Sequence, residues 1–216
     1  MKLKPFVLFI VLAFAITAHA QGFLSNLSIG VGGEGVFPSS TFQKSGYSSG
    51  NFNNPPAQTT SNSVGGIVDA RYDFGHHSAL GVAVSFNRAT EYYVDSEATF
   101  THVKSNNVEI IGSYIFRLPS NERVKPYAMF GGGMVHFGPV TGYDTTGTPD
   151  SQMKAAFAYG MGTDIRMSDR VSLRLQYRGL VRTDPDFKLY SSNPGGFGTQ
   201  LRSNVAEPSI QIVYHF

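Results

Sequence analysis

The sequence contains no cysteine and no tryptophan, and only 15% of its residues are charged. The absence of cysteine excludes disulfide bonds, cysteine-ligated zinc or iron–sulfur sites and thiol catalysis. Average soluble domains carry roughly 25% charged residues, so the low charge of this 216-residue chain indicates an unusual solvent. Glycine, phenylalanine and tyrosine are abundant instead, with 24, 17 and 11 copies.

The sequence also lacks the excess of basic residues that nucleic-acid binding requires. The formal net charge is +2, and it comes from Lys2 and Lys4. Without the first 20 residues, none of which is acidic, 15 basic residues stand against 15 acidic ones. We therefore expect no nucleic-acid partner.

Long apolar runs are absent except at the N-terminus, where residues 6–16 are continuously apolar after the two lysines. A spanning helix needs about 20 apolar residues, so this run is too short to be one. The small-x-small pattern at 18–20 predicts a signal peptide over residues 1–20, cleaved between Ala20 and Gln21. The alternative is an uncleaved N-terminal anchor. Residues 21–216 then form the mature domain.

The dominant pattern of the mature chain is alternation of apolar and small or polar residues with a period of two, which is typical of β-strands. It occurs eight times, near 27–37, 64–74, 79–87, 108–118, 127–137, 157–167, 171–178 and 209–216. In seven of these stretches one face is clearly more apolar. In 127–137 we assign Tyr127, Met129, Val135 and Phe137 to the apolar outer face, and place His136 on the inner one.

The connections between these stretches alternate strictly in length. Short turns lie near 75–77, 119–124 and 168–170, whereas the segments 38–63, 88–105, 138–151 and 183–204 are long. All long connections therefore fall on one rim. This pattern predicts an all-β fold, an eight-stranded antiparallel up-and-down transmembrane β-barrel of a Gram-negative-type outer membrane. A soluble periplasmic barrel is the alternative.

The division of side chains between the two faces favours lipid outside the barrel. An eight-stranded barrel has an interior only just wide enough for side chains, so small residues and a few long charged groups fit inside better than rings of Leu and Phe. Aromatic residues at the short-turn ends suit an interfacial girdle, although they also suit ordinary strands. These residues are Tyr72, Phe74, Tyr114, Phe116, Tyr214 and Phe216.

The segments 125–133, 158–166 and 168–178 resemble the second half of small outer-membrane barrels of the outer membrane protein A and opacity-protein type. The ending Tyr214-His215-Phe216 is similar to the C-terminal aromatic signature of that family. The resemblance implies insertion in outer-membrane lipid and recognition of Tyr214 and Phe216 by the barrel-assembly machinery.

Ten charged residues fall on the predicted inner face, five acidic and five basic. We predict that they form an ion-pair network that plugs the lumen, because unpaired charges there would be costly. The alternative is a narrow path, which would make the protein a channel or carrier for small or hydrophobic solutes. The ten residues are Glu34, Asp69, Arg71, Asp73, Glu109, Arg117, Asp164, Arg166, Arg174 and Arg178.

Enzymatic chemistry has weak support. His76 and His77 lie in a short turn, and their spacing does not converge on one metal ion. His136, with Asp144 and Asp150 in the next loop, is the better candidate for a lipid A-modifying enzyme. We interpret His136 as a satisfied lumen side chain instead, and predict no enzyme activity, cofactor or metal.

The long loops are the remaining candidates for function. Segments 38–63 and 183–204 mix tyrosine and phenylalanine with serine, asparagine, glycine and proline, a composition found in loop-built binding surfaces. Solvated loops without a ligand are the alternative. We predict a structural or surface-interaction role, of an adhesion type, with a host or surface ligand bound at these loops.

Overall fold

The computed structural model describes residues 25–39, 41–42, 57–75, 77–94, 100–120, 123–140, 148–187 and 202–216. The predicted signal peptide, its cleavage site after Ala20 and most of the loops 38–63 and 183–204 lie outside these residues and stay predictions. Within the described part of the chain, no helix is long and apolar enough to cross a membrane.

Eight long strands and two short ones make up the described structure. The long strands are β1 (Leu27–Pro38), β4 (Ser63–Asp73), β5 (Ser78–Val94), β6 (Phe100–Arg117), β7 (Val124–Pro139), β8 (Gln152–Arg166), β9 (Val171–Thr183) and β10 (Arg202–His215). The short strands are β2 (Thr41–Phe42) and β3 (Ala57–Thr60).

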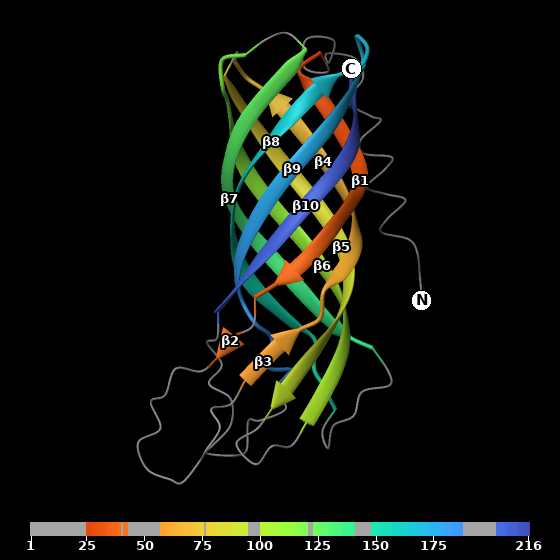
Figure 1. Cartoon of the computed structure of the whole chain (residues 1–216), viewed down its shortest axis with the longest axis vertical. Coiled ribbons are helices and arrows are strands. Elements are labelled where there is room, and N and C mark those ends of the chain that lie inside the picture. The colour runs from red at the N-terminus through yellow and green to blue at the C-terminus, as the bar shows by residue number, and fades with distance from the viewer. Residues whose placement is uncertain are drawn as a thin grey trace, which may run out of the picture.

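The eight long strands form a closed cylinder in which each pairs antiparallel with its neighbours (Figure 1). Pairing of β5 with β6 and of β1 with β10 completes the ring, and Ile29 stands opposite Tyr214 at this second seam. Short turns lie at one end of the cylinder, and β2 and β3 lie beyond the other (Figure 1). The predicted eight-stranded up-and-down barrel is confirmed.

Side chains alternate between the two faces of the wall, as the period of two requires. Val64, Met161 and Ile212 on the outer face are 81%, 66% and 65% exposed, whereas Glu109 and Arg174 on the inner face are fully buried. The predicted faces are confirmed for seven of the eight strands.

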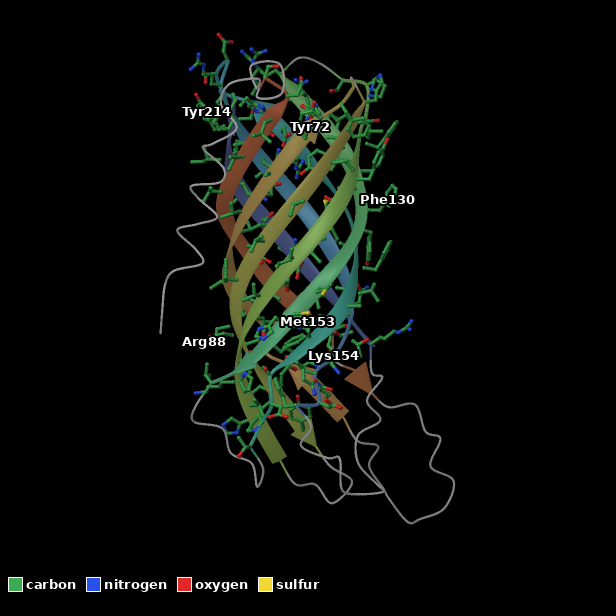
Figure 2. All side chains as sticks on the ribbon, turned by 180° about the vertical axis from the view of Figure 1, so that it is seen from behind. Tyr72, Arg88, Phe130, Met153, Lys154 and Tyr214 are labelled. Carbon is green, nitrogen blue, oxygen red and sulfur yellow. The ribbon has the colours of Figure 1, made fainter. Side chains whose placement is uncertain are left out.

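Strand β7 is the exception, and the predicted orientation of its residues is wrong. Tyr127, Val135 and Phe137 are buried inside the barrel, whereas Phe130 and Met134 lie outside it. Figure 2 shows Phe130 on the outer surface. Both faces of β7 carry large apolar groups, so alternation alone did not identify the inner one.

A glycine on the neighbouring strand β8 explains why the aromatic ring of Tyr127 fits inside the barrel. A Cβ atom at Gly162 on β8 would lie 2.4 Å from the Tyr127 hydroxyl oxygen. Gly162 stands directly opposite Tyr127 in the β7–β8 ladder, so the phenol occupies the space that a side chain would fill. The position of Tyr127 is therefore decided by its neighbour across the ladder rather than by its own strand.

The predicted loop 88–105 is also corrected. Strands β5 and β6 remain paired from Ser78 opposite Phe116 as far as Val94 opposite Phe100, leaving only 95–99 between them. Strand β3 extends this hairpin by pairing with 91–94 of β5. A paired sheet therefore continues past the other strands at the long-loop end (Figure 1).

Aromatic side chains gather on the outer face near the short-turn end. The rings of Phe74 and Tyr114 are 6.1 Å apart, and those of Tyr114 and Phe130 are 5.6 Å apart. Tyr214 and Phe216 make an edge-to-face contact with ring centroids 5.1 Å apart. These contacts form an aromatic belt of the kind that membrane barrels place at an interface.

Candidate functional site in the barrel lumen

Every carboxylate in the described strand segments faces into the barrel. Arginines from β4 and β9 reach the same space, so the interior is filled by charged groups in three layers. We name them the turn-side layer, nearest the short turns, the middle layer and the loop-side layer.

The turn-side layer contains two aspartates and two arginines in balance. Arg174 binds Asp69 and Asp164 at 2.7 Å each, through Nη1 and Nε. Arg71 Nε lies 3.0 Å from Asp69 Oδ2. All four side chains are almost completely buried, and each charge has an opposite charge within hydrogen-bond distance. The layer therefore carries no net charge.

Arg71 also links this layer to the inward-facing residues of β7 and β9. Its Nη2 atom donates to Gln176 Oε1 at 2.6 Å and to the Tyr127 hydroxyl at 3.0 Å. The guanidinium lies 4.5 Å from the centre of the Tyr127 ring, and the Tyr127 hydroxyl donates to Gln176 at 2.8 Å. Because Tyr127 faces inward, contrary to the sequence prediction, β7 supplies a hydrogen-bond partner for Arg71.

The middle layer brings three glutamates around one arginine. Arg178 Nε lies 2.5 Å from Glu207 Oε2, and Arg178 Nη2 lies 2.8 Å from Glu109 Oε2. Glu34 Oε2 is more distant, 3.4 Å from the same Nη2 atom. Ser85 donates a hydrogen bond to Glu109 at 3.0 Å. The second oxygen of each glutamate has no hydrogen-bond partner among the described residues, so acid is in excess here.

The loop-side layer contains Arg182, Glu91 and Asp184. Arg182 Nη1 is 3.8 Å from Glu109 Oε1, which joins this layer to the middle one. The Arg182 guanidinium also lies 4.9 Å from the centre of the Phe137 ring. Thr60 on β3 donates to Glu91 at 2.5 Å. Burial raises the pKa of Glu91 to about 7, against the attraction of Arg182 and the hydrogen bond from Thr60.

Residues 184–187 fold across the mouth at this end. The Pro185 carbonyl accepts hydrogen bonds from the Tyr93 hydroxyl at 2.7 Å and from Gln58 Nε2 at 3.0 Å. Phe187 is fully buried with a φ of 48°, and its carbonyl accepts from the Asp150 amide at 3.1 Å. We call this the 184–187 cover. It ties the segment after β9 to the β3–β5 sheet.

At the other end, a polar cavity of about 290 Å³ opens among the short turns. Its lining includes Asp73, Arg117, Lys125, Asp164 and His215. Arg117 and Asp73 pair at 2.7 Å and are partly exposed. Because Asp164 is also bound to Arg174, the floor of this cavity is the turn-side layer.

The structure places the ten residues predicted for the lumen in different positions along it. Seven lie in the turn-side and middle layers, and Asp73 with Arg117 lies at the short-turn mouth. Arg166 lines the short-turn cavity beside these two residues but is exposed, and it binds Asp169 in the turn after β8 at 2.8 Å.

Sequence reasoning missed four buried charges of the lumen. These residues are Glu91, Arg182, Asp184 and Glu207. Glu91 and Arg182 lie where strand alternation continues past the predicted strand ends, and Glu207 lies two residues before the predicted start of the last strand. A signal was available: arginines at 174, 178 and 182 keep one parity, so all three share a face.

The position predicted for His136 is wrong. It lies exposed on the outer face of β7, not inside the lumen. Of its conceivable partners, Asp144 is outside the described residues. Among the residues that are described, no group of three or more His, Asp or Glu side chains could hold a metal ion.

A family model for the outer membrane protein β-barrel domain matches residues 6–200. The chain belongs to this family. It is thus a protein of the Gram-negative outer membrane, as predicted, and its outward apolar face is the face toward lipid. No curated protein sequence matches the chain.

Solved outer-membrane proteins share the barrel fold at low sequence identity. OprG from Pseudomonas aeruginosa is 12% identical with a TM-score of 0.59, over 90% of this chain and 97% of OprG. Neisserial surface protein A is 15% identical with a TM-score of 0.54, over 89% and 98%. Ail of Yersinia pestis, in complex with the heparin analogue sucrose octasulfate, is 16% identical with a TM-score of 0.50, over 88% and 97%. At these identities the likeness concerns the fold alone.

Proposed function

We propose that the protein is a closed outer-membrane barrel that acts at the cell surface, by binding a host or surface ligand through its long-loop end. The observation that carries the proposal is the filling of the lumen. Three charged layers cross it, and the 184–187 cover folds over one mouth. Since outer-membrane barrels place their long loops outside the cell, the cover is then extracellular.

The shape of the long-loop end supports a binding role. Strands β5 and β6 stay paired as far as Val94 and Phe100, beyond the apolar band, and β3 widens this sheet. A paired hairpin holds its loop in place at a lower entropic cost than a free loop would need. The described ends of the two long loops meet at this sheet, where the Pro185 carbonyl accepts hydrogen bonds from Gln58 of β3 and Tyr93 of β5. Ail, solved with a heparin analogue, is a barrel of the same fold that binds a ligand.

Planar-bilayer recording tests the closed lumen. The purified barrel should give no reproducible unitary conductance, because a current would have to cross layers in which arginine and carboxylate are in direct contact. The matched control is Arg178→Ala, which removes the cation at the centre of the middle layer but leaves Arg174 bound to Asp69 and Asp164, so it should also give no conductance. Stepwise conductance from the unmodified protein would instead favour a channel.

Loop replacement tests the surface role. Exchanging 43–56 and 188–201 for short glycine–serine linkers leaves every described strand pair in place. Whole cells that display this variant should lose adhesion to host cells or matrix, while a variant with an altered short turn at 119–123 keeps it. Equal adhesion by all three would contradict the ligand-binding proposal without affecting the closed lumen.

A further inference from the structure

The outer face of the barrel carries charge of one sign only. Among the described strand residues, the charged side chains that point outward are Arg88, Lys104 and Arg202, and all three are cations. All three lie at the long-loop end. Strand carboxylates turn inward, so nothing on the described outer wall neutralises these cations.

Two of these cations are neighbours on the β5–β6 sheet. Arg88 stands opposite Asn106, and Lys104 is two residues further along β6, opposite Thr90. This diagonal relation separates their Cα atoms by about 7–8 Å, which is within reach of one anionic group. Arg88 Nε donates to Asn106 Oδ1 at 2.8 Å, which leaves the Nη atoms free of hydrogen bonds to any described residue.

His136 on β7 completes the group. It stands opposite Val108, two residues from the Asn106–Gly138 pair. A Cβ atom at Gly138 would lie 3.5 Å from His136 Cε1, so the imidazole leans over Gly138 toward Asn106. We call Arg88, Lys104, Asn106 and His136 the outer basic patch. All four side chains are exposed, and Figure 2 shows Arg88 on the outside of the wall.

The patch begins where the apolar band ends. The cross-strand pair next to Arg88 and Asn106 is Phe86 with Val108, and Phe86 is 52% exposed. Ile110 and Met134, both 54% exposed, continue the apolar surface below it. A molecule held here has hydrocarbon against the band and an anion against the patch.

We propose that the outer basic patch binds the phosphate of a phosphorylated glycolipid of the outer leaflet, with the acyl chains lying on Phe86, Val108 and Ile110. Charge complementarity and continuity with the lipid-facing band select this occupant over a soluble anion. Arginine supplies paired donors to phosphate oxygens and lysine adds a point charge. This site is separate from the ligand surface proposed for the loops and does not depend on it.

The test uses the full barrel in nanodiscs of phosphatidylcholine that contain a small fraction of bisphosphorylated lipid A. Native mass spectrometry counts the lipid A retained by the protein. Each cation near an anionic lipid contributes about a fivefold factor in binding, so Arg88→Gln with Lys104→Gln should weaken retention about 25-fold. Heat-modifiable gel migration verifies that each variant is folded.

Arg202→Gln is the matched control, because it removes one outward cation at the same end but on β10, away from the patch. Retention by this variant should change less than twofold, whereas Arg88→Gln alone should lower it about fivefold. Equal effects of the two single variants would show a general electrostatic attraction at this end of the barrel and would contradict a specific phosphate site. Undiminished retention by the double variant would also overturn it.

Two further arms identify the ligand chemistry. Dephosphorylated lipid A should not be retained, and inorganic phosphate in solution should not displace the bound lipid. Equal retention of the dephosphorylated lipid would show that acyl chains alone are recognised. Displacement by inorganic phosphate would assign the patch to a soluble anion. Either result contradicts the proposal.

Discussion

Arg178 is surrounded by more negative charge than it can neutralise. Its guanidinium contacts Glu207, Glu109 and Glu34. A second cation, Arg182, lies 3.8 Å from Glu109. A buried ion pair adds little net stability, but removal of one partner leaves the other charge buried and unpaired. The cost of losing Arg178 therefore greatly exceeds the cost of losing any one of its glutamates.

We expect Arg178→Met to lower the free energy of unfolding by about 3–5 kcal/mol, because three carboxylates then face one another without a counter-ion. Glu34→Gln should cost less than about 1 kcal/mol, since its contact of 3.4 Å is the longest of the three and its loss reduces the acid excess. Urea unfolding in detergent, followed by circular dichroism, measures both. Equal midpoints for the two variants would contradict this account.

Glu91 makes the stability of the loop-side end of the barrel depend on pH. It lies three residues beyond Arg88, past the apolar band, and faces Thr60 and Gln58 of β3 and Arg182 and Asp184 at the end of β9. Burial raises its pKa from 4.5 to about 7, which favours the neutral carboxyl in the folded protein. Between these values the folded chain holds a proton that the unfolded chain has released.

The stabilisation from this proton is thus complete at acidic pH and is lost as the pH rises through about 7. We expect amides of β3 and of β5 near Glu91 to exchange hydrogen faster at pH 8 than at pH 5, after correction for the intrinsic exchange rate. In Glu91→Gln the corrected rates should be the same at both pH values, and those near Arg71 should be unaffected. A variant with the wild-type pH response would exclude Glu91 as the cause.

At the scale of the strand, β6 and β7 approach each other so closely near Gly133 that this position has no room for a side chain. A Cβ atom at Gly133 would lie 1.9 Å from the Ile110 carbonyl oxygen, which belongs to the backbone and cannot move aside as a side chain can. Gly112 on the partner strand points outward, and a Cβ there would meet nothing nearer than 3.8 Å. Two glycines of the same ladder therefore have opposite tolerance to substitution.

Gly133→Ala should destabilise the barrel by several kcal/mol or prevent its assembly, because the β6–β7 ladder must shift. Gly112→Ala should leave stability within about 0.5 kcal/mol. The fraction of heat-modifiable protein in the membrane, together with its unfolding midpoint in urea, compares the two. Normal assembly of Gly133→Ala would contradict the close approach.

The limits of sequence reasoning also appear at this scale. Alternation identified the faces wherever one side was plainly apolar, as at Leu173 and Leu175 opposite Arg174. It did not orient β7, whose inward Tyr127 depends on a gap left by Gly162 across the ladder. It also ended β5 too early, because polar outward residues such as Arg88 look like loop when the partner strand is unknown.

For the whole molecule, the number of strands, their order around the barrel and the membrane location could be predicted from the alternation of loop lengths and from the composition. The grouping of charges into layers could not be predicted in this way. It depends on the shear of the barrel, which brings residues from strands far apart in the sequence to the same height along the lumen. Asp69 and Arg174 are 105 residues apart in the chain and in contact in the lumen. Such contacts form only when the barrel closes, so the residue pattern of a single strand does not predict them.

The seam between β1 and β10 has a consequence for the timing of folding. Ser28 pairs with His215, so the ring cannot close until β10 is available to pair with β1. Until then the first strand keeps an unpaired edge, and an exposed edge invites pairing with other chains. Closing so long a loop is slow compared with forming a local hairpin. The barrel therefore closes last at this seam, and β1 keeps one unprotected edge until β10 pairs with it.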